Sequence, residues 1–159
     1  MSGRRRVVLT VNDEERSLEV FTDETLLDTL RERLGIFSVR GACGIGICGT
    51  CTVLVDGRPI SACLSLSALQ EGASITTSEG LAERAGGLDE VQQAFVDKDA
   101  FQCSYCIPGI VLTVRAYLDS TDDPTVEGAA EVLAGNLCRC GTYPQIREAI
   151  AQLVDRTRG

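Results

Sequence analysis

Residues 41–51, GACGIGICGTC, carry three of the eight cysteines of this 159-residue chain. The thiols of Cys43, Cys48 and Cys51 follow the spacing C-x4-C-x2-C, and glycine is interleaved with them at positions 41, 44, 46 and 49. A loop that folds around a metal centre needs glycine, because it requires turns with positive φ and backbone amides close to the sulfur atoms. The stretch therefore predicts a metal-binding loop.

Cys63 is the expected fourth thiol of this loop. The segment that separates it from Cys51 begins with a β-branched run and turns at Asp56-Gly57, a dipeptide favoured in two-residue type I′ turns. In the hairpin that this pattern predicts, Cys51 lies opposite Ala62, so the chain returns to the other thiols at Cys63. The first site is therefore expected to contain four thiols.

The spacing C-x4-C-x2-C is the one found in plant-type [2Fe-2S] ferredoxins, and it favours a binuclear iron-sulfur cluster. Residues 44–49 also spell G-x-G-x-x-G, but a strand rather than a helix is predicted next, which disfavours dinucleotide binding. A structural zinc site stays open as an alternative, although such sites usually pair short C-x2-C knuckles.

Composition limits the other function classes. With 44% hydrophobic residues the chain can form packed cores, as one average domain or two small ones. Eight cysteines without a secretory signal predict a reducing compartment in which thiols stay free for metal. No stretch approaches the length of a transmembrane helix, so we expect a soluble, cytoplasmic protein with no membrane insertion. The chain has no histidine, which excludes a Rieske centre and Cys2His2 zinc sites. A net charge of −8 disfavours nucleic acid as a partner.

The N-terminal half reads as strands around one helix. Apolar and polar residues alternate at 7–11 and 18–20, which predicts a β-hairpin, and residues 74–77 are expected to form a last strand. Between them an amphipathic helix is predicted, capped by Thr22 or Asp23 and followed by Gly35, with an apolar face of Leu26, Leu27, Leu30 and Leu34. With the metal loop at its edge, this arrangement describes a β-grasp plant-type ferredoxin domain over residues 1–79.

Residues 80–87 look like a linker, and the pattern beyond them is helical. Four amphipathic helices are predicted over residues 88–159, with apolar faces centred on Phe95, Val111, Ala130 and Ile150. The fold class is therefore predicted as α+β, with the β-grasp domain followed by an all-α four-helix domain.

The helical half contains the other four cysteines: Cys103, Cys106, Cys138 and Cys140. Cys138 and Cys140 would point to opposite sides of a helix, so they must lie in a loop to serve one metal. Cys106 precedes a helix start, whose amides and dipole are expected to stabilise a thiolate. A second four-thiol metal site is predicted here. Zinc is a stronger alternative at this site than at the first one, because a C-x2-C knuckle is generic.

Taken together, the motifs resemble those of the iron-sulfur subunit of the molybdenum hydroxylases, the xanthine oxidase family. The resemblance rests on GACGIGICGTCTVLVDG at 41–57, QCSYCIPG at 102–109 and GNLCRCGTYPQI at 135–146, in that order. Within the family, the sequence Gly141-Thr142-Tyr143 after the last cysteine is slightly more similar to the isoquinoline or aldehyde oxidoreductases than to the carbon monoxide or xanthine enzymes. The resemblance implies two [2Fe-2S] clusters, one held by Cys43, Cys48, Cys51 and Cys63 and the other by Cys103, Cys106, Cys138 and Cys140.

The resemblance also implies a function in electron transfer, with no catalytic residues in this chain. A large partner subunit would hold a molybdopterin cofactor, and electrons would pass from it through the helical-domain cluster and the ferredoxin-like cluster, often to FAD on a medium subunit. Gln102 and Cys140 would lie beside the pterin at the point of entry. The alternative is a free-standing two-cluster ferredoxin that works as a diffusible carrier.

Overall fold

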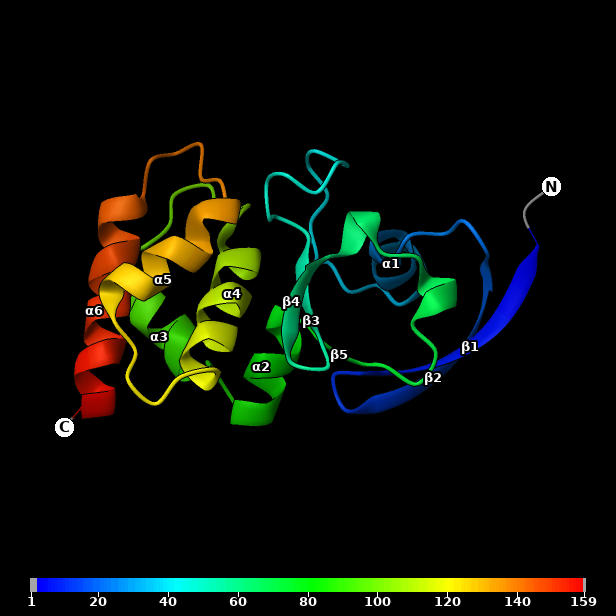
Figure 1. The fold of residues 1–159 in the computed structure, drawn as a ribbon, viewed down its shortest axis with the longest axis horizontal. Helices are drawn as coiled ribbons and strands as arrows, with labels where there is room; N and C mark the ends of the chain where they lie inside the picture. The colour runs from blue at the N-terminus through cyan, green and yellow to red at the C-terminus, as the bar shows by residue number, and fades with distance from the viewer. Residues whose placement is uncertain (1–2, 159) are drawn as a thin grey trace.

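The structure is a computed structural model that describes residues 3–158. Figure 1 shows an elongated molecule in which a half built on a β-sheet lies next to a helical half. The N-terminal strand and the C-terminal helix lie at opposite ends of the molecule (Figure 1). The mixed α+β class and the order of the two halves agree with the prediction.

The first half is built on one five-stranded sheet. Its strands are β1 (Arg4–Val11), β2 (Glu14–Phe21), β3 (Thr52–Val55), β4 (Arg58–Ser61) and β5 (Ser74–Thr76), in the order β2-β1-β5-β3-β4. Strand β1 is antiparallel to β2 and parallel to β5, while β3 is antiparallel to both β4 and β5. The hairpin after Cys51 is confirmed, because the Ala62 amide donates to the Cys51 carbonyl at 3.3 Å.

The first half contains a helix that packs against the sheet. It begins as α1 (Leu26–Asp28) and continues as a π-helical turn, Thr29–Arg33. Leu26 and Leu30 are fully buried, and they share a core with the inward-facing strand residues Val7, Leu9, Val20, Val53 and Ile75. Burial of each such side chain contributes about 1.5–3 kcal/mol. The predicted apolar face is confirmed.

The two ends of this helix were predicted with different success. The prediction of Thr22 or Asp23 as the cap is wrong, because the cap is Thr25, whose hydroxyl accepts a hydrogen bond from the Asp28 amide at 3.1 Å. At the other end Gly35 has φ of 69°, the left-handed conformation expected after a helix.

A buried carboxylate ties the helix to the strand before it. Glu24 accepts hydrogen bonds from both Nε and Nη2 of Arg33 at 2.5 Å, from the Thr29 hydroxyl at 2.7 Å and from the Phe21 amide at 3.2 Å. The Arg33 hydrogen bonds, opposed by burial, hold the pKa of Glu24 below its ordinary value of 4.5. The contribution of Glu24 to stability is therefore present above pH 4.5 and is lost as the pH falls through the lowered pKa.

We expect Glu24→Gln to lower the free energy of unfolding at pH 7 by about 1–3 kcal/mol, because it removes a charged acceptor from several donors. Denaturant unfolding at pH 7 and pH 4 should show the difference from wild type shrinking at the lower pH. Glu14→Gln, at an exposed Arg16 pair, is the matched control and should change little at either pH. A Glu24→Gln difference that is the same at both pH values would contradict this account.

The second half is helical. Its α-helices are α2 (Ser78–Ala85), α3 (Glu90–Asp97), α4 (Ile107–Asp119), α5 (Val126–Val132) and α6 (Tyr143–Arg158). They enclose a second core that includes Phe95, Ile110, Leu112, Ile146, Ile150 and Leu153. Leu54 of β3 belongs to this helical core, and α4 lies against β3 and β4 (Figure 1). The two halves are therefore packed together as well as joined in sequence.

Helix α2 was not predicted, since it lies in the segment expected to be a linker. Leu81 of this helix is 7% exposed and packs in the helical core. Gln92 donates to the Ser78 carbonyl at 2.8 Å, and Arg84 forms an ion pair with Asp13 at 2.5 Å. These contacts to distant parts of the chain stabilise the helix. In residues 3–158, no helix combines the length and the apolar character needed to cross a bilayer.

Candidate metal centres

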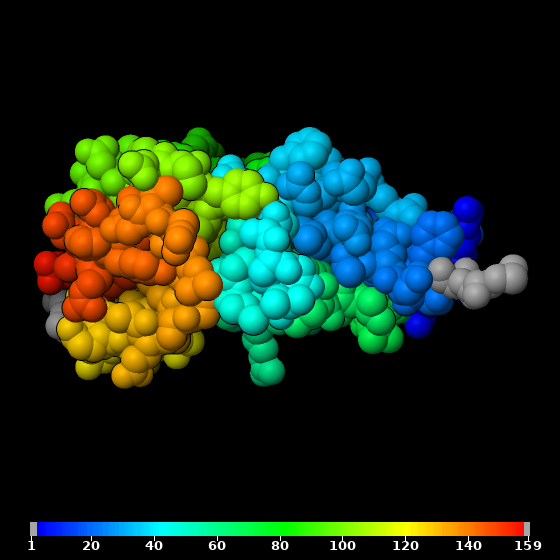
Figure 2. Space-filling view, turned by 90° about the horizontal axis from the view of Figure 1, so that it is seen from above, coloured from blue at the N-terminus to red at the C-terminus, as the bar shows by residue number. Residues whose placement is uncertain are grey.

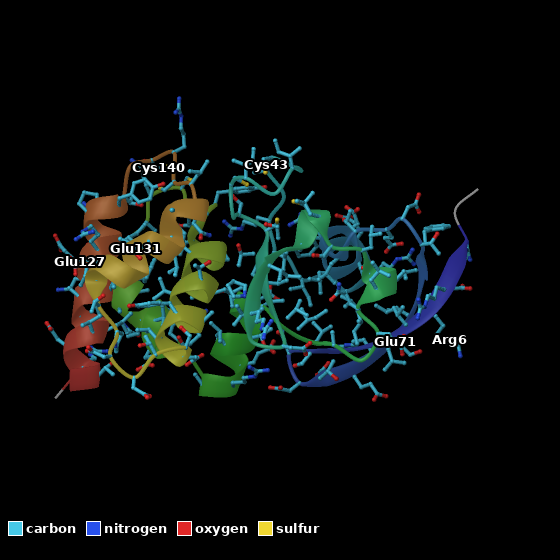
Figure 3. All side chains as sticks on the ribbon, in the orientation of Figure 1. Arg6, Cys43, Glu71, Glu127, Glu131 and Cys140 are labelled. Carbon is cyan, nitrogen blue, oxygen red and sulfur yellow. The ribbon has the colours of Figure 1, made fainter. Side chains whose placement is uncertain are left out.

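The two sets of cysteines lie on the same side of the molecule. Figure 3 labels Cys43 and Cys140, which lie on neighbouring loops at the upper edge of the two halves. Seen from that side, the cyan surface of the first cysteine loop adjoins the orange surface of the loop before α6 (Figure 2). Both loops therefore open toward one face of the protein.

The four thiols of the first set lie together in two pairs. Cys43 contacts Cys48, and Cys51 contacts Cys63, with Cys48 close enough to Cys51 to interact through its charge. The first pair is half-buried and the second is buried. The glycines between the thiols have positive φ, with 68° at position 44, 72° at position 46 and 66° at position 49. The loop geometry that the sequence predicted is confirmed.

The backbone amides of the loop favour a negatively charged sulfur at Cys43, which lies at the less buried end of the set. Hydrogen bonds from the backbone amides of Ile45 and Cys48 lower the pKa of the Cys43 thiol to about 6. At the inner end burial raises the pKa of the Cys51 thiol to about 11. Amides that point at sulfur are the groups that stabilise and tune a thiolate-bound iron-sulfur cluster. The donor set fits such a cluster.

The second set also forms two pairs. Cys103 contacts Cys140 at the exposed end, and Cys106 contacts Cys138 at the buried end. Cys106 is the residue before α4, as predicted. A cavity of about 420 Å³ is lined by Cys103, Cys106 and Cys138 together with Cys48 of the first set.

The thiols of the second set differ in their surroundings. Burial has the largest influence on the Cys106 thiol and raises its pKa to about 12, although a backbone hydrogen bond at the helix start acts in the opposite direction. Burial opposes ionisation of Cys138, but hydrogen bonds from the hydroxyl and amide of Thr142, from the Cys106 thiol and from the Cys140 amide together lower its pKa to about 7. The Thr142 hydroxyl lies 3.3 Å from the Cys138 sulfur. Sequence reasoning missed this contact, although Thr142 stands four residues after Cys138.

Pairs of thiols suit a binuclear cluster, in which four cysteines are shared between two irons. A structural zinc ion instead takes its four ligands around one point. Two contacting pairs of thiols in each set therefore suit a [2Fe-2S] cluster.

Two tyrosines near the thiols have structural contacts. The Tyr143 hydroxyl accepts a hydrogen bond from the Cys138 amide at 2.8 Å and donates one to the Asn136 carbonyl at 3.2 Å. The Tyr105 hydroxyl donates to the Gly41 carbonyl at 2.7 Å. Both hydroxyls therefore bind backbone groups of the cysteine loops and help to fix those loops in place.

The loops of the two sets touch each other. The Leu137 amide donates to the Cys48 carbonyl at 2.9 Å, and the Asn136 side chain donates to the Gly49 carbonyl at 3.1 Å. Asn136 is 4% exposed, so this contact is shielded from water. Since Leu137 precedes Cys138, one hydrogen bond joins the backbones that carry a thiol of each set.

Two family models match the chain. Residues 9–82 match a "2Fe-2S iron-sulfur cluster binding domain" and residues 77–151 match a "[2Fe-2S] binding domain". The small FeS subunit of nicotinate dehydrogenase from Eubacterium barkeri is 42% identical, over 93% of this chain and 94% of that protein. The iron-sulfur-binding subunit of an Escherichia coli K12 aldehyde oxidoreductase is 41% identical, over 91% of this chain and 69% of that protein.

The solved structures agree with the sequence comparisons. A chain of quinoline 2-oxidoreductase from Pseudomonas putida 86 superposes with a TM-score of 0.91 at 36% identity, over 99% of this chain and 98% of that chain. An aldehyde oxidoreductase from Desulfovibrio gigas superposes on this chain with a TM-score of 0.88 at 33% identity, but this chain covers only 18% of that longer chain. The two-part fold, the paired thiols and these relatives lead to one conclusion: the chain belongs to the family of iron-sulfur subunits of molybdenum hydroxylases.

Proposed function

We propose that this chain is the electron-transfer subunit of a molybdenum-dependent oxidoreductase and performs no substrate chemistry of its own. The observation that carries the proposal is the pair of thiol sets, which open on one face and are joined by the Cys48–Leu137 hydrogen bond. Two [2Fe-2S] clusters would supply one-electron redox chemistry at these sets. The relatives are named as subunits, which favours this function over a free-standing ferredoxin.

We assign four thiols to each cluster. Cys43, Cys48, Cys51 and Cys63 would hold the first, and Cys103, Cys106, Cys138 and Cys140 the second. The residues around them have separate tasks: backbone amides beside Cys43 and the Thr142 hydroxyl beside Cys138 stabilise anionic sulfur. Burial of Cys51 and Cys106 excludes water from the inner end of each site.

The domain organisation follows the same division. We propose a β-grasp ferredoxin-like domain over residues 1–79, a connecting segment at 80–87 that contains most of helix α2, and a four-helix cluster-binding domain over 88–159, formed by α3 to α6. The eight free thiols support a cytoplasmic location, because a reducing compartment preserves them.

The partner of the helical set is a large subunit that binds the molybdopterin cofactor, and a medium FAD subunit or an external acceptor receives electrons from the ferredoxin-like set. We propose that Gln102 and Cys140 lie at the point of entry. Cys140 contacts Cys103 at the exposed end of the helical set, and Gln102 is exposed beside it. A glutamine amide offers an acceptor and a donor in one plane, and a pterin edge presents both kinds of group.

Gln102→Ala should slow reduction of the helical-domain cluster by substrate in the assembled complex, while iron content and visible spectra stay unchanged. The reason is that the variant removes an interface contact but no cluster ligand. Rapid mixing of the complex with substrate measures the rate, and Gln93→Ala on the exposed face of α3 is the matched control. A Gln102→Ala rate equal to that of the control would rule out the role of Gln102.

A further inference from the structure

A set of reciprocal contacts joins the first cysteine loop to the C-x2-C loop of the helical half. The Arg40 guanidinium donates to the Ser104 carbonyl at 2.6 Å, and its carbon lies 5.3 Å from the centre of the Tyr105 ring. In return the Tyr105 hydroxyl donates to the Gly41 carbonyl at 2.7 Å. Each loop therefore contributes one side chain that binds the backbone of the other.

The positions of these residues in the chain are informative. Arg40 and Gly41 lead directly into the first cysteine loop, while Ser104 and Tyr105 stand between Cys103 and Cys106. The contacts therefore act on the segments that carry the thiols, at a sequence separation of 64 residues. Ser104 has φ of 61°, an uncommon conformation for a residue other than glycine.

The chemistry of the two side chains suits a rigid contact. A guanidinium is planar and always charged, so it can donate to a carbonyl while it stacks on an aromatic face. Tyr105 is 45% exposed, and its hydroxyl nevertheless donates to a backbone carbonyl. Charge-assisted hydrogen bonds are stronger than neutral ones, which favours a fixed geometry at this place.

We propose that Arg40 and Tyr105 form an interdomain clamp that fixes the distance and orientation between the two cluster sites. The inference rests on the proposed function, because it concerns transfer of one electron from the helical-domain cluster, which is oxidised, to the ferredoxin-like cluster, which is reduced. Transfer rates fall steeply with separation, so a fixed spacing sets the rate. Arg40 and Tyr105 are positioning residues and do not bind the clusters.

A second connection joins the loops of the two thiol sets. The Asn136 and Leu137 contacts hold the other cysteine loop of the helical half against residues 48–49. The second connection combines a backbone hydrogen bond from Leu137 with a side-chain hydrogen bond from Asn136, so a side-chain change removes only part of it. The clamp is made by two side chains, so it can be removed while the packing of α4 against β3 is retained.

The test is electron paramagnetic resonance of the full chain after complete reduction with dithionite. Two reduced clusters are both paramagnetic, and their magnetic interaction falls steeply with distance, so it splits the signals of a rigid pair. Tyr105→Phe removes one hydrogen bond and keeps the ring, whereas Arg40→Gln removes both the hydrogen bond and the stacking. We expect Tyr105→Phe to weaken the splitting, Arg40→Gln to weaken it further and the double variant to weaken it most, because the remaining contacts between the two halves keep the sites close but no longer in one fixed geometry.

Matched controls separate the clamp from general effects. Tyr117→Phe removes a tyrosine hydroxyl that bonds to Thr125 within the helical half, and Arg115→Gln removes ion pairs to Glu90 and Asp119 in the same half. Both should keep the splitting of wild type. Iron content and the signal of each cluster after partial reduction should be unchanged in all variants, because no ligand is altered.

The outcomes distinguish the clamp from the proposed function. Unchanged splitting in the double variant with both clusters intact would overturn the clamp and leave the proposed function standing. Loss of iron in both Arg40→Gln and Tyr105→Phe would also overturn it, since the two residues would then hold a cluster. Absence of two reducible clusters in the wild-type chain would instead overturn the proposed function itself.

Discussion

Replacing Gly109 with alanine should lower the thermal stability of the chain and disturb both cysteine loops. A Cβ atom at this position would lie 2.3 Å from the Gly49 carbonyl oxygen and 3.3 Å from that of Thr50. Both obstacles are backbone, so no side chain can rotate away. The helix start at Gly109 and the first cysteine loop are therefore in direct contact, which only glycine permits.

The first cysteine loop cannot easily retreat from the added methyl group. The Gly49 carbonyl accepts hydrogen bonds from the Thr52 hydroxyl at 2.7 Å and from Asn136 at 3.1 Å. Overpacking of this kind costs about 1–3 kcal/mol. For a chain of this size each kcal/mol lowers the midpoint of thermal unfolding by roughly 2–4 °C.

Thermal unfolding of cluster-loaded protein measures this effect. Gly87→Ala is the matched control, because a Cβ at position 87 meets no atom within 4 Å. Gly109→Ala should unfold several degrees below Gly87→Ala and should also change the magnetic interaction between the reduced clusters. Equal midpoints and an unchanged interaction would show that the contact between Gly109 and Gly49 is looser than the structure indicates.

The second large effect is expected from single thiols. Cys48→Ser should remove the ferredoxin-like cluster and Cys138→Ser the helical-domain cluster, because each belongs to a separate set of four. Iron should fall from about four to about two per chain in either variant. Each variant serves as the control for the other, since each should retain the signal that the other loses.

Iron analysis and paramagnetic resonance of the two reduced variants provide the measurement. Loss of both signals from one substitution would mean that the sets do not bind independently. Retention of both signals in Cys138→Ser would remove Cys138 from the ligand set. Either result would require a different assignment of the eight cysteines.

Local structure could be predicted from the sequence wherever one short segment decides it. The hairpin of β3 and β4 follows from Asp56-Gly57, a turn whose chemistry lies within the dipeptide. Gly35 predicted the end of the helix equally well, because a glycine that takes a left-handed conformation is itself the local signal. The grouping of thiols into two sets also follows from loop spacing, and the thiols of each set do lie together.

Features that depend on distant residues could not be predicted. Thr25 caps α1 where it pairs with Leu66, a partner on a later loop. Helix α2 has Leu81 as its main apolar anchor, and its other contacts come from Gln92 and Asp13. The placement of β5 between β1 and β3 likewise has no local signature.

The same limit applies to the site. Sequence spacing separated the two thiol sets, but it could not show that Cys103 pairs with Cys140 or that Thr142 contacts Cys138. The Arg40 contact with Ser104 joins two different motifs, and neither motif alone predicts it. Relations between motifs require the folded chain.

The central claim is that this chain holds two binuclear iron-sulfur clusters with different surroundings. Metal analysis of the full chain together with paramagnetic resonance after reduction by dithionite tests it directly. We predict about four irons per chain and two distinguishable signals, one for each set of four thiols. Zinc in place of iron, or a single signal with about two irons, would contradict the account.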